Sequence, residues 1–318
     1  MRILVVGGAG FVGRELCRQL SAEHQVGVLD CFRYGKERLA FGARRSPRLY
    51  AVDINGAPAV AAVVAEFKPE TVVHLAATHY IPECEDDPFA AVKTNVAGTV
   101  NLLAACPAGC RFVFASSGAV YAPDVHPHVE SESPVGPSDV YGLTKLQAEQ
   151  YVHYFASKRN LAAVTVRLFN VVGPGETNPH LVPDMVAQVR AGRTEIALGN
   201  LWPRRSYLHV KDAAAGFAAA ATGGGVSPGA AVTVNLGAPQ AHSVSEIAEL
   251  LGRISGRRFS LRQDEARVRP VDRPVLAADH TKMTAMFGWR PRHGVDEALK
   301  DIWRNPDLVG DLGARYRG

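Results

Sequence analysis

The chain opens with the stretch Met1-Arg2-Ile3-Leu4-Val5-Val6-Gly7-Gly8-Ala9-Gly10-Phe11-Val12-Gly13. Its apolar, β-branched start predicts a buried strand, and the leucine spacing after the last glycine predicts a helix. Three glycines spaced Gly-x-x-Gly-x-x-Gly let the backbone approach a pyrophosphate with no Cβ in the way, while the helix N-terminus offers free N–H groups. We therefore expect Gly7, Gly10, Phe11, Val12 and Gly13 to contact a dinucleotide.

A second predicted strand follows this turn and ends in Asp30. A carboxylate at that strand end hydrogen-bonds ribose hydroxyls and repels a 2′-phosphate. The expected cofactor is therefore NAD rather than NADP.

Composition excludes several classes of protein. The chain has 318 residues, 47% of them hydrophobic, and a net charge of +4 that is spread along the sequence without a basic stripe. Nucleic acid binding is therefore not expected. Membrane insertion is not expected either, because no apolar stretch reaches about 20 residues. Five cysteines without a C-x-x-C pair indicate reduced thiols and a cytoplasmic protein. We expect no metal site, and His126 and His128 are interpreted as loop residues.

Strand and helix patterns alternate through the first half, which is typical of an α/β fold with a doubly wound parallel (Rossmann) sheet. The segment 1–169 is the expected NAD-binding domain. The segment 170–318 is irregular and proline-rich, and is the expected smaller C-terminal α/β substrate lobe, with segments near 207–221 and 232–237 returning to the first domain. Further predicted strands are Leu49–Val52, Thr71–His74, Phe112–Ala115 and Ala163–Leu168, and predicted helices are Pro58–Phe67, Phe89–Ala105 and Val140–Ser157.

Tyr141 and Lys145 are four residues apart, so a helix places them on one face. An ammonium beside a phenol favours the phenolate, so we expect Lys145 to lower the pKa of Tyr141 and make it a general base. Ser117 follows a predicted strand end, where ligands bind in such sheets. Tyrosine and lysine are also common on helix surfaces, so the pair alone is a weak signal.

Together these patterns resemble the extended short-chain dehydrogenase/reductases of the NAD-dependent nucleotide-sugar epimerase/dehydratase family, over nearly the whole chain. The matching stretches are Gly7–Gly13, Val52-Asp53-Ile54, His74-Leu75-Ala76-Ala77, Asn95–Thr99, Ser116–Tyr121, Tyr141–Lys145, Arg167–Pro174, Arg205–Asp212 and Gly288-Trp289-Arg290-Pro291.

The resemblance implies roles for individual residues. Ser117, Tyr141 and Lys145 are the implied catalytic residues, with Lys145 also on the nicotinamide ribose. Further implied cofactor contacts are Asp53, Ile54, Leu75, Ala76, Ala77, Asn95 and Phe169. The implied substrate contacts are His79, Tyr80, Ser117, Gly118, Asn170, Arg205 and Arg269, of which the two arginines would grip the diphosphate.

The resemblance also implies a reaction: transient oxidation of a nucleotide-diphosphate sugar, with C4 as the expected position, through a 4-keto intermediate and with no net redox change. The family's dehydratases follow the catalytic hydroxyl with an Asp-Glu pair. Here Gly118 and Ala119 stand in those places, and neither can move a proton. The pattern therefore favours a 4-epimerase.

Alternatives remain open at this point. Ser206 and the stretch Arg269–Pro274 depart from the family's usual residues, and Leu198–Leu201 resembles enzymes of GDP- and CDP-sugars. A 4-keto reductase or a 4,6-dehydratase-like oxidoreductase is the enzymatic alternative, and an NAD-binding sensor the non-enzymatic one. The sugar, its nucleotide and the roles of His79, Tyr80 and Glu83 are undecided.

The resemblance further implies a homodimer that associates through the predicted helices Phe89–Ala105 and Val140–Ser157. Apolar residues of the first helix would face either the partner or the sheet; these are Val92, Val96, Val100 and Leu103.

Overall fold

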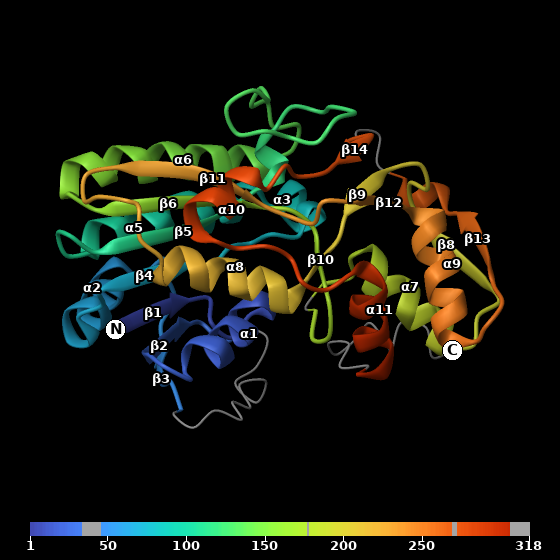
Figure 1. Ribbon diagram of the computed structural model, residues 1–318, viewed down its shortest axis with the longest axis horizontal. Helices are drawn as coiled ribbons and strands as arrows, with labels where there is room; N and C mark the ends of the chain where they lie inside the picture. Colours follow the sequence, from blue (N-terminus) through green and yellow to red (C-terminus); the bar gives the residue numbers. More distant parts are fainter. Residues whose placement is uncertain (34–45, 177, 269–271, 306–318) are drawn as a thin grey trace.

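The computed structural model describes residues 1–33, 46–176, 178–268 and 272–305 (Figure 1). One large sheet and a smaller lobe make up this part of the chain. The sheet has seven parallel strands in the order β11-β6-β5-β4-β1-β2-β3. Their bounds are β1 Arg2–Val6, β2 Gln25–Asp30, β3 Arg48–Ala51, β4 Thr71–His74, β5 Arg111–Ser117, β6 Ala162–Leu168 and β11 Ala231–Leu236.

The central strands of this sheet are buried on both sides, because helices cover both of its faces. On one face lie α1 (Phe11–Leu20) and α8 (Val210–Thr222), which bury Leu16 and Phe217 in the core. On the other face lie α2 (Ala57–Phe67), α5 (Gly98–Ala105) and α6 (Val140–Arg159). The expected fold class, a doubly wound α/β sheet with a smaller α/β lobe, is confirmed.

The predicted helix Phe89–Ala105 is less regular than its pattern indicates. It consists of α4 (Pro88–Val92), a π-helical turn η1 (Lys93–Ala97) and α5. The short helix α3 (Ile81–Asp86) precedes it, and the 3-10 turn η2 (Gly118–Val120) follows β5 directly. Leu103 is fully buried in the core, whereas Val92 is exposed.

The smaller lobe has its own apolar core, which includes Met185, Ile247 and Leu299. Its helices are α7 (Leu181–Arg190), α9 (Val244–Ser255) and α11 (Val295–Arg304). In the short sheets β9 pairs with both β12 and β14, β13 pairs with β8, and β10 pairs with β7. The bounds are β7 Val171–Val172, β8 Glu195–Leu198, β9 Arg204–Ser206, β10 Leu208–His209, β12 Ala241–Ser243, β13 Ser260–Gln263 and β14 Val275–Leu276; η3 (Glu265–Arg267) and α10 (Thr281–Phe287) complete the elements.

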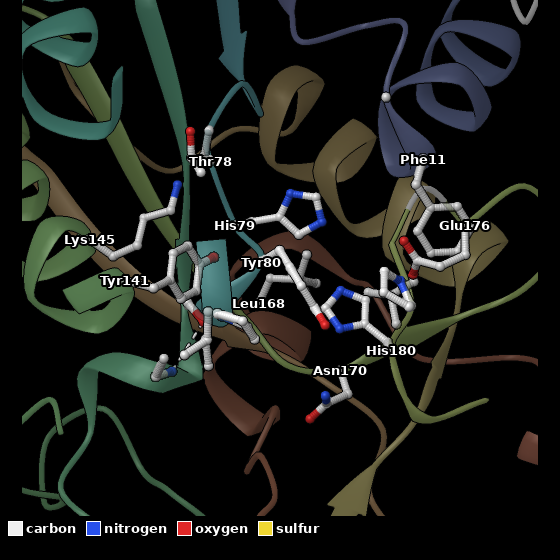
Figure 2. Close-up of a pocket in the computed structure, with 18 of the residues that line it drawn as sticks. Phe11, Thr78, His79, Tyr80, Tyr141, Lys145, Leu168, Asn170, Glu176 and His180 are labelled. Atoms are coloured by element: carbon white, nitrogen blue, oxygen red, sulfur yellow. Dashed lines mark hydrogen bonds between the residues drawn. The ribbon is translucent and has the colours of Figure 1, made fainter. Parts of the chain in front are cut away.

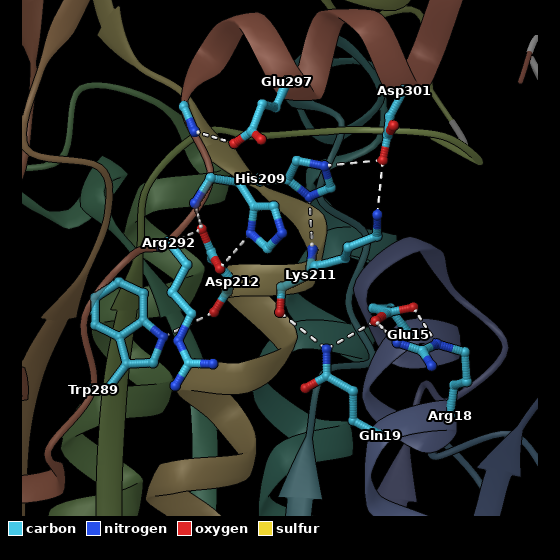
Figure 3. A network of polar contacts seen from close by, with 12 residues as sticks. Glu15, Arg18, Gln19, His209, Lys211, Asp212, Trp289, Arg292, Glu297 and Asp301 are labelled. Carbon is cyan, nitrogen blue, oxygen red and sulfur yellow. Dashed lines mark hydrogen bonds and ion pairs between the residues drawn. The ribbon is translucent and has the colours of Figure 1, made fainter. Parts of the chain in front are cut away.

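A polar network joins the lobe to the large sheet at the start of α8 (Figure 3). Lys211 Nζ donates to Asp301 of α11 at 2.8 Å, and the buried Asp212 carboxylate lies 2.8 Å from His293 Nδ1. Gln19 of α1 donates to the Lys211 carbonyl at 3.0 Å. The network therefore fixes α11 against α8 and α1, and so fixes the lobe over the carboxyl edge of the sheet. Within the described ranges no helix combines the length and the apolar character that crossing a bilayer requires.

Candidate active site

A cavity of about 1170 Å³ lies at the carboxyl edge of the sheet, between the sheet and the smaller lobe (Figure 2). Ligands bind at this edge in doubly wound sheets, because the loops that leave the strands converge there. Its lining includes the predicted residues Gly7, Gly10, Phe11, Val12, Gly13, Asp30, Asp53, Ile54, Leu75, Ala76, Ala77, His79, Tyr80, Ser117, Tyr141, Lys145, Phe169, Asn170 and Arg205. Arg269 lies outside the described residues.

The glycine turn between β1 and α1 is too tight for side chains. Gly7 has φ +82°, and a Cβ there would lie 2.5 Å from the Ala76 nitrogen. A Cβ on Gly13 would lie 2.3 Å from the Gly7 oxygen. Gly10 is the N-cap of α1, so the N-terminus of this helix opens on the cavity, where a pyrophosphate would be stabilised.

Asp30 terminates β2 at the cavity wall. Its carboxylate accepts hydrogen bonds from the Phe32 amide at 2.7 Å and the Ala9 amide at 2.9 Å. Burial raises the pKa of Asp30, and these two amides oppose the effect. Asp53 and Ile54 line the same end of the cavity. The glycine turn, the helix N-terminus and a carboxylate one strand away fit a dinucleotide with an unphosphorylated ribose.

Ser117, Tyr141 and Lys145 come together in the cavity, Ser117 as the last residue of β5 and the other two in the first turns of α6. The Ser117 hydroxyl acts on the phenol of Tyr141 and lowers its pKa. It also accepts from the Ala119 amide at 3.1 Å. Lys145 Nζ donates to the Ala115 carbonyl at 2.8 Å and lies 5.8 Å from the centre of the Tyr141 ring. The structure therefore places the three residues as the sequence predicts, within one cavity.

The structure corrects the prediction that Lys145 lowers the pKa of Tyr141. Burial raises the pKa of Tyr141 above its ordinary value, and the Ser117 hydroxyl is the group that lowers it. Burial also lowers the pKa of Lys145 to about 8, against the charges of Cys84 and Glu149. Desolvation of the buried phenol is the largest effect on this pKa, and burial cannot be seen in the spacing of Tyr141 and Lys145.

Phe169 and Gly118 fit together at the base of this site. A Cβ on Gly118 would lie 3.0 Å from the Phe169 ring, so Gly118 contributes to the site by letting this ring approach and is itself behind the cavity lining. Asn95 also does not line the cavity. Its side chain accepts a hydrogen bond from the Thr78 amide, donates to the Thr78 carbonyl, and donates to the Thr144 hydroxyl at 2.9 Å. Asn95 therefore fixes the loop that follows β4.

Two predicted substrate residues differ in how they are paired. Asn170 Oδ1 is buried without a hydrogen-bond partner, which is the state expected of an acceptor or amide that meets a ligand. Arg205 Nη2 donates to Asp272 Oδ1 at 2.5 Å, and both side chains are largely buried. A diphosphate at Arg205 would therefore compete with a carboxylate of the protein.

His79 and Tyr80 face the cavity beside residues that sequence reasoning missed (Figure 2). A ring nitrogen of His79, a ring nitrogen of His180 and a carboxylate oxygen of Glu176 all lie within 4.8 Å of one another. Asn178 Nδ2 lies 3.0 Å from His79 Nε2. Burial lowers the pKa of His79 to about 4, the Lys145 charge adds to this, and a bond to the Ala77 backbone opposes it. His79 is therefore neutral near pH 7. Glu176 and His180 lie about 100 residues from His79 in the sequence, so only the folded chain reveals this cluster.

The comparisons with known proteins agree with this geometry. The profile of the NAD dependent epimerase/dehydratase family matches residues 3–237, and the chain belongs to this family. A UDP-glucose 4-epimerase of Corynebacterium glutamicum is 31% identical, with 98% of this chain and 97% of the relative covered.

Two solved structures are similar along their whole length. The UDP-glucose 4-epimerase of Thermus thermophilus in complex with NAD has a TM-score of 0.84 and 28% identity, covering 98% of this chain and 99% of that one. The UDP-glucose 4-epimerase of Thermotoga maritima with UDP-glucose has a TM-score of 0.83 and 27% identity, covering 96% and 98%. The expected class, an NAD-dependent nucleotide-sugar epimerase, is confirmed.

Proposed function

We propose that the protein interconverts the two C4 epimers of a UDP-hexose, with UDP-glucose and UDP-galactose as the first pair to test. One observation carries this interpretation: Ser117 and Tyr141 lie in the same cavity as the dinucleotide-type turn, and the two residues after Ser117 carry no acid or base. The second part of the observation separates an epimerase from a dehydratase, which must also move the proton of a leaving water. The choice of uridine rests on the relatives named UDP-glucose 4-epimerase.

The cavity residues divide between cofactor and sugar. Gly7–Gly13 would hold the pyrophosphate of NAD, Asp30 the adenosine ribose, Asp53 and Ile54 the adenine, and Lys145 and Phe169 the nicotinamide end. When bound, NAD supplies a reversible hydride acceptor. Tyr141 as phenolate takes the proton from the sugar 4-hydroxyl, and the Ser117 hydroxyl donates to the oxygen as it becomes a carbonyl. The 4-keto sugar turns over in the cavity and so presents the opposite face of C4 to the returning hydride, and Tyr141 gives the proton back to the C4 oxygen.

The residues around the sugar follow from the same placement. Asn170, which lies between β6 and β7, and Arg205 of β9 would bind the diphosphate. His79, neutral near pH 7, and Tyr80 would hydrogen-bond sugar hydroxyls opposite Tyr141. Such anchoring at the diphosphate leaves the hexose free to present either face.

The experiment is a conversion assay. Purified protein is incubated with UDP-glucose or UDP-galactose, and in parallel with GDP-, CDP- and dTDP-hexoses, and the products are separated by chromatography. Formation of the C4 epimer from both directions, without accumulation of NADH, supports the proposal. Conversion of a 4-keto sugar at the expense of added NADH would instead identify a 4-keto reductase. Bound NAD without conversion of any sugar nucleotide would identify a sensor.

We also propose a homodimer that associates through α4 and α6. These two adjacent helices expose large apolar side chains, namely Phe89, Val92, Leu143, Tyr151 and Tyr154. Exposed apolar side chains gathered on one surface mark interaction sites. A cytoplasmic location is proposed as well, supported by five free cysteines.

A further inference from the structure

Arg273 is a buried arginine close to the catalytic residues but outside the set identified from the sequence. Its side chain is only 7% exposed. Nη1 donates to Asp139 Oδ2 at 3.1 Å, and Nη2 donates to the Ala119 carbonyl at 2.9 Å. The guanidinium therefore contacts two segments that are about twenty residues apart in the chain and that carry the two catalytic hydroxyls.

The first contact is the cap of the catalytic helix. Asp139 is the N-cap of α6, and its Oδ1 accepts from the Gly142 amide at 2.7 Å. Tyr141 lies in the turn that this bond closes. One carboxylate thus caps the helix with one oxygen and binds Arg273 with the other, which fixes the entry angle of the chain at Tyr141.

The second contact is the turn after Ser117. Ala119 donates its amide hydrogen to Ser117 Oγ at 3.1 Å, and its carbonyl accepts from Arg273. The same peptide segment is therefore held on both sides, by the catalytic hydroxyl and by the arginine.

The backbone of Arg273 belongs to the smaller lobe and touches the diphosphate end of the cavity. Asp272 Oδ1 accepts from both the Arg273 amide at 2.8 Å and Arg205 Nη2. Arg205 Nη1 donates to the Arg273 carbonyl at 2.8 Å. Arg273 therefore stands between the arginine that faces the substrate and the turn and helix that hold Ser117 and Tyr141.

A buried ion pair adds little net stability compared with apolar side chains of similar size, because desolvation offsets the attraction. The ion pair instead fixes the relative orientation of the two segments, because a planar guanidinium donates to its two acceptors at fixed angles.

We propose that Arg273 is a positioning residue for the reaction: its guanidinium holds the turn after Ser117 and the first turn of the Tyr141 helix at a fixed distance from each other and from the substrate-side pair Arg205–Asp272. The proposal rests on the proposed function, in which Tyr141 and Ser117 act on the same hydroxyl. A displacement of about 1 Å between them is enough to cost roughly 100-fold in rate.

An electrostatic consequence separates this role from a merely structural one. The groups near Tyr141 are Asp139 at the N-cap of α6, Lys145 on α6, Ser117 on β5 and Cys84 on α3. Glu85 of α3 accepts from the amide of the adjacent Val140. Of these, the negative charge of Asp139 raises the pKa of Tyr141. Arg273 binds that carboxylate, so its removal leaves the charge uncompensated.

The test compares Arg273→Met, Arg273→Lys, Asp139→Asn and the double variant Arg273→Met/Asp139→Asn by the pH dependence of kcat/KM. Asparagine caps a helix as well as aspartate does, so Asp139→Asn keeps α6 intact. The matched control is Arg262→Met, which breaks an exposed pair with Glu195 on β8. Thermal unfolding and NAD content are measured for each protein.

We expect Arg273→Met to lower kcat by about 10- to 100-fold with KM changed less than about threefold, and to move the rising limb of the profile upward by about half a pH unit or more. Asp139→Asn moves the rising limb of the profile to lower pH, and the double variant returns this limb toward its wild-type position. Arg273→Lys keeps the limb near wild type but loses rate, because an ammonium cannot satisfy both acceptors. Arg262→Met is unchanged.

Coincident profiles for wild type and Arg273→Met would overturn the proposal, and so would shifts of Arg273→Met and Asp139→Asn in the same direction. A fall in rate that only follows lost NAD or lost folding in both Arg273 variants would overturn it too. Failure of the proposed function has a different signature, because wild type itself would then not interconvert the C4 epimers of a UDP-hexose.

Discussion

Arg205 and Asp272 form a largely buried ion pair at 2.5 Å on the wall of the cavity, where a diphosphate is expected to bind. A phosphate at Arg205 must share or displace this carboxylate. The pair therefore keeps the guanidinium oriented before the substrate arrives. Displacing the carboxylate costs free energy, which the charge of a diphosphate can offset.

Arg205→Ala should raise KM for the UDP-sugar by roughly 10- to 100-fold with a smaller effect on kcat, because a hydrogen bond to a charged group contributes about 1.5–3 kcal/mol. Steady-state kinetics measure KM and kcat, and calorimetric titration with UDP measures the affinity for the nucleotide. Arg204→Ala is the matched control, since Arg204 is half exposed and pairs with Glu246. If the Arg205 variant and wild type bound UDP with equal affinity, the proposal that Arg205 binds the diphosphate would be wrong.

Tyr141→Phe should lower kcat by about 10²–10⁴-fold, because it removes the proton carrier and leaves the ring in place. NAD content, read by absorbance after denaturation, should equal that of wild type. Because burial raises the pKa of Tyr141, the rate of the wild-type enzyme should still be rising with pH above neutrality. A rate independent of pH between about 6 and 9 would place the essential base elsewhere.

Asp30→Asn should reduce the preference for NAD over NADP by roughly tenfold, or about 1.4 kcal/mol. Asparagine keeps an oxygen that can accept from the Ala9 or the Phe32 amide but removes the charge that repels a 2′-phosphate. Fluorescence titration of the cofactor-stripped protein with each dinucleotide measures the ratio. An unchanged ratio would mean that residues other than Asp30 select the cofactor.

Tyr154→Glu combined with Phe89→Glu should convert the proposed dimer into a monomer, since both side chains are among the most exposed large apolar residues of α6 and α4. Light scattering across micromolar concentrations gives the mass. Val125→Glu, which alters an exposed apolar residue of the loop after Tyr121, is the control and should keep the mass of wild type. A wild-type monomer would remove the interface.

The candidate catalytic residues could be predicted from the sequence because each of them lies in a short, contiguous pattern. A glycine turn must follow a strand, and Tyr141 and Lys145 must share a helix face, whatever the rest of the chain does. Glu176, His180 and Arg273 could not be read in this way, because their neighbours come from distant segments brought together by the packing of the lobe. The expectation for the pKa of Tyr141 was wrong for the same reason: burial is a property of the assembled cavity. The π turn in the predicted helix Phe89–Ala105 also has no pattern in the sequence.

His128→Phe should make the protein less sensitive to mild acid. His128 is buried and stacks on Tyr121 with ring centres 4.4 Å apart, and neither of its ring nitrogens has a hydrogen-bond partner. Burial lowers its pKa to about 4, while the charge of Asp124 opposes this. The unfolded chain therefore takes up a proton at a higher pH than the folded protein does, so this contribution to stability is present above about pH 6.5 and is lost as the pH falls toward 4. The loss between about pH 7 and pH 5 is on the order of 2 kcal/mol. Phenylalanine keeps the aromatic stack and does not titrate. Urea unfolding at the two pH values should show a smaller loss for the variant than for wild type, with His126→Phe, on an exposed loop, as the control. Equal losses in all three proteins would show that other groups govern the acid sensitivity.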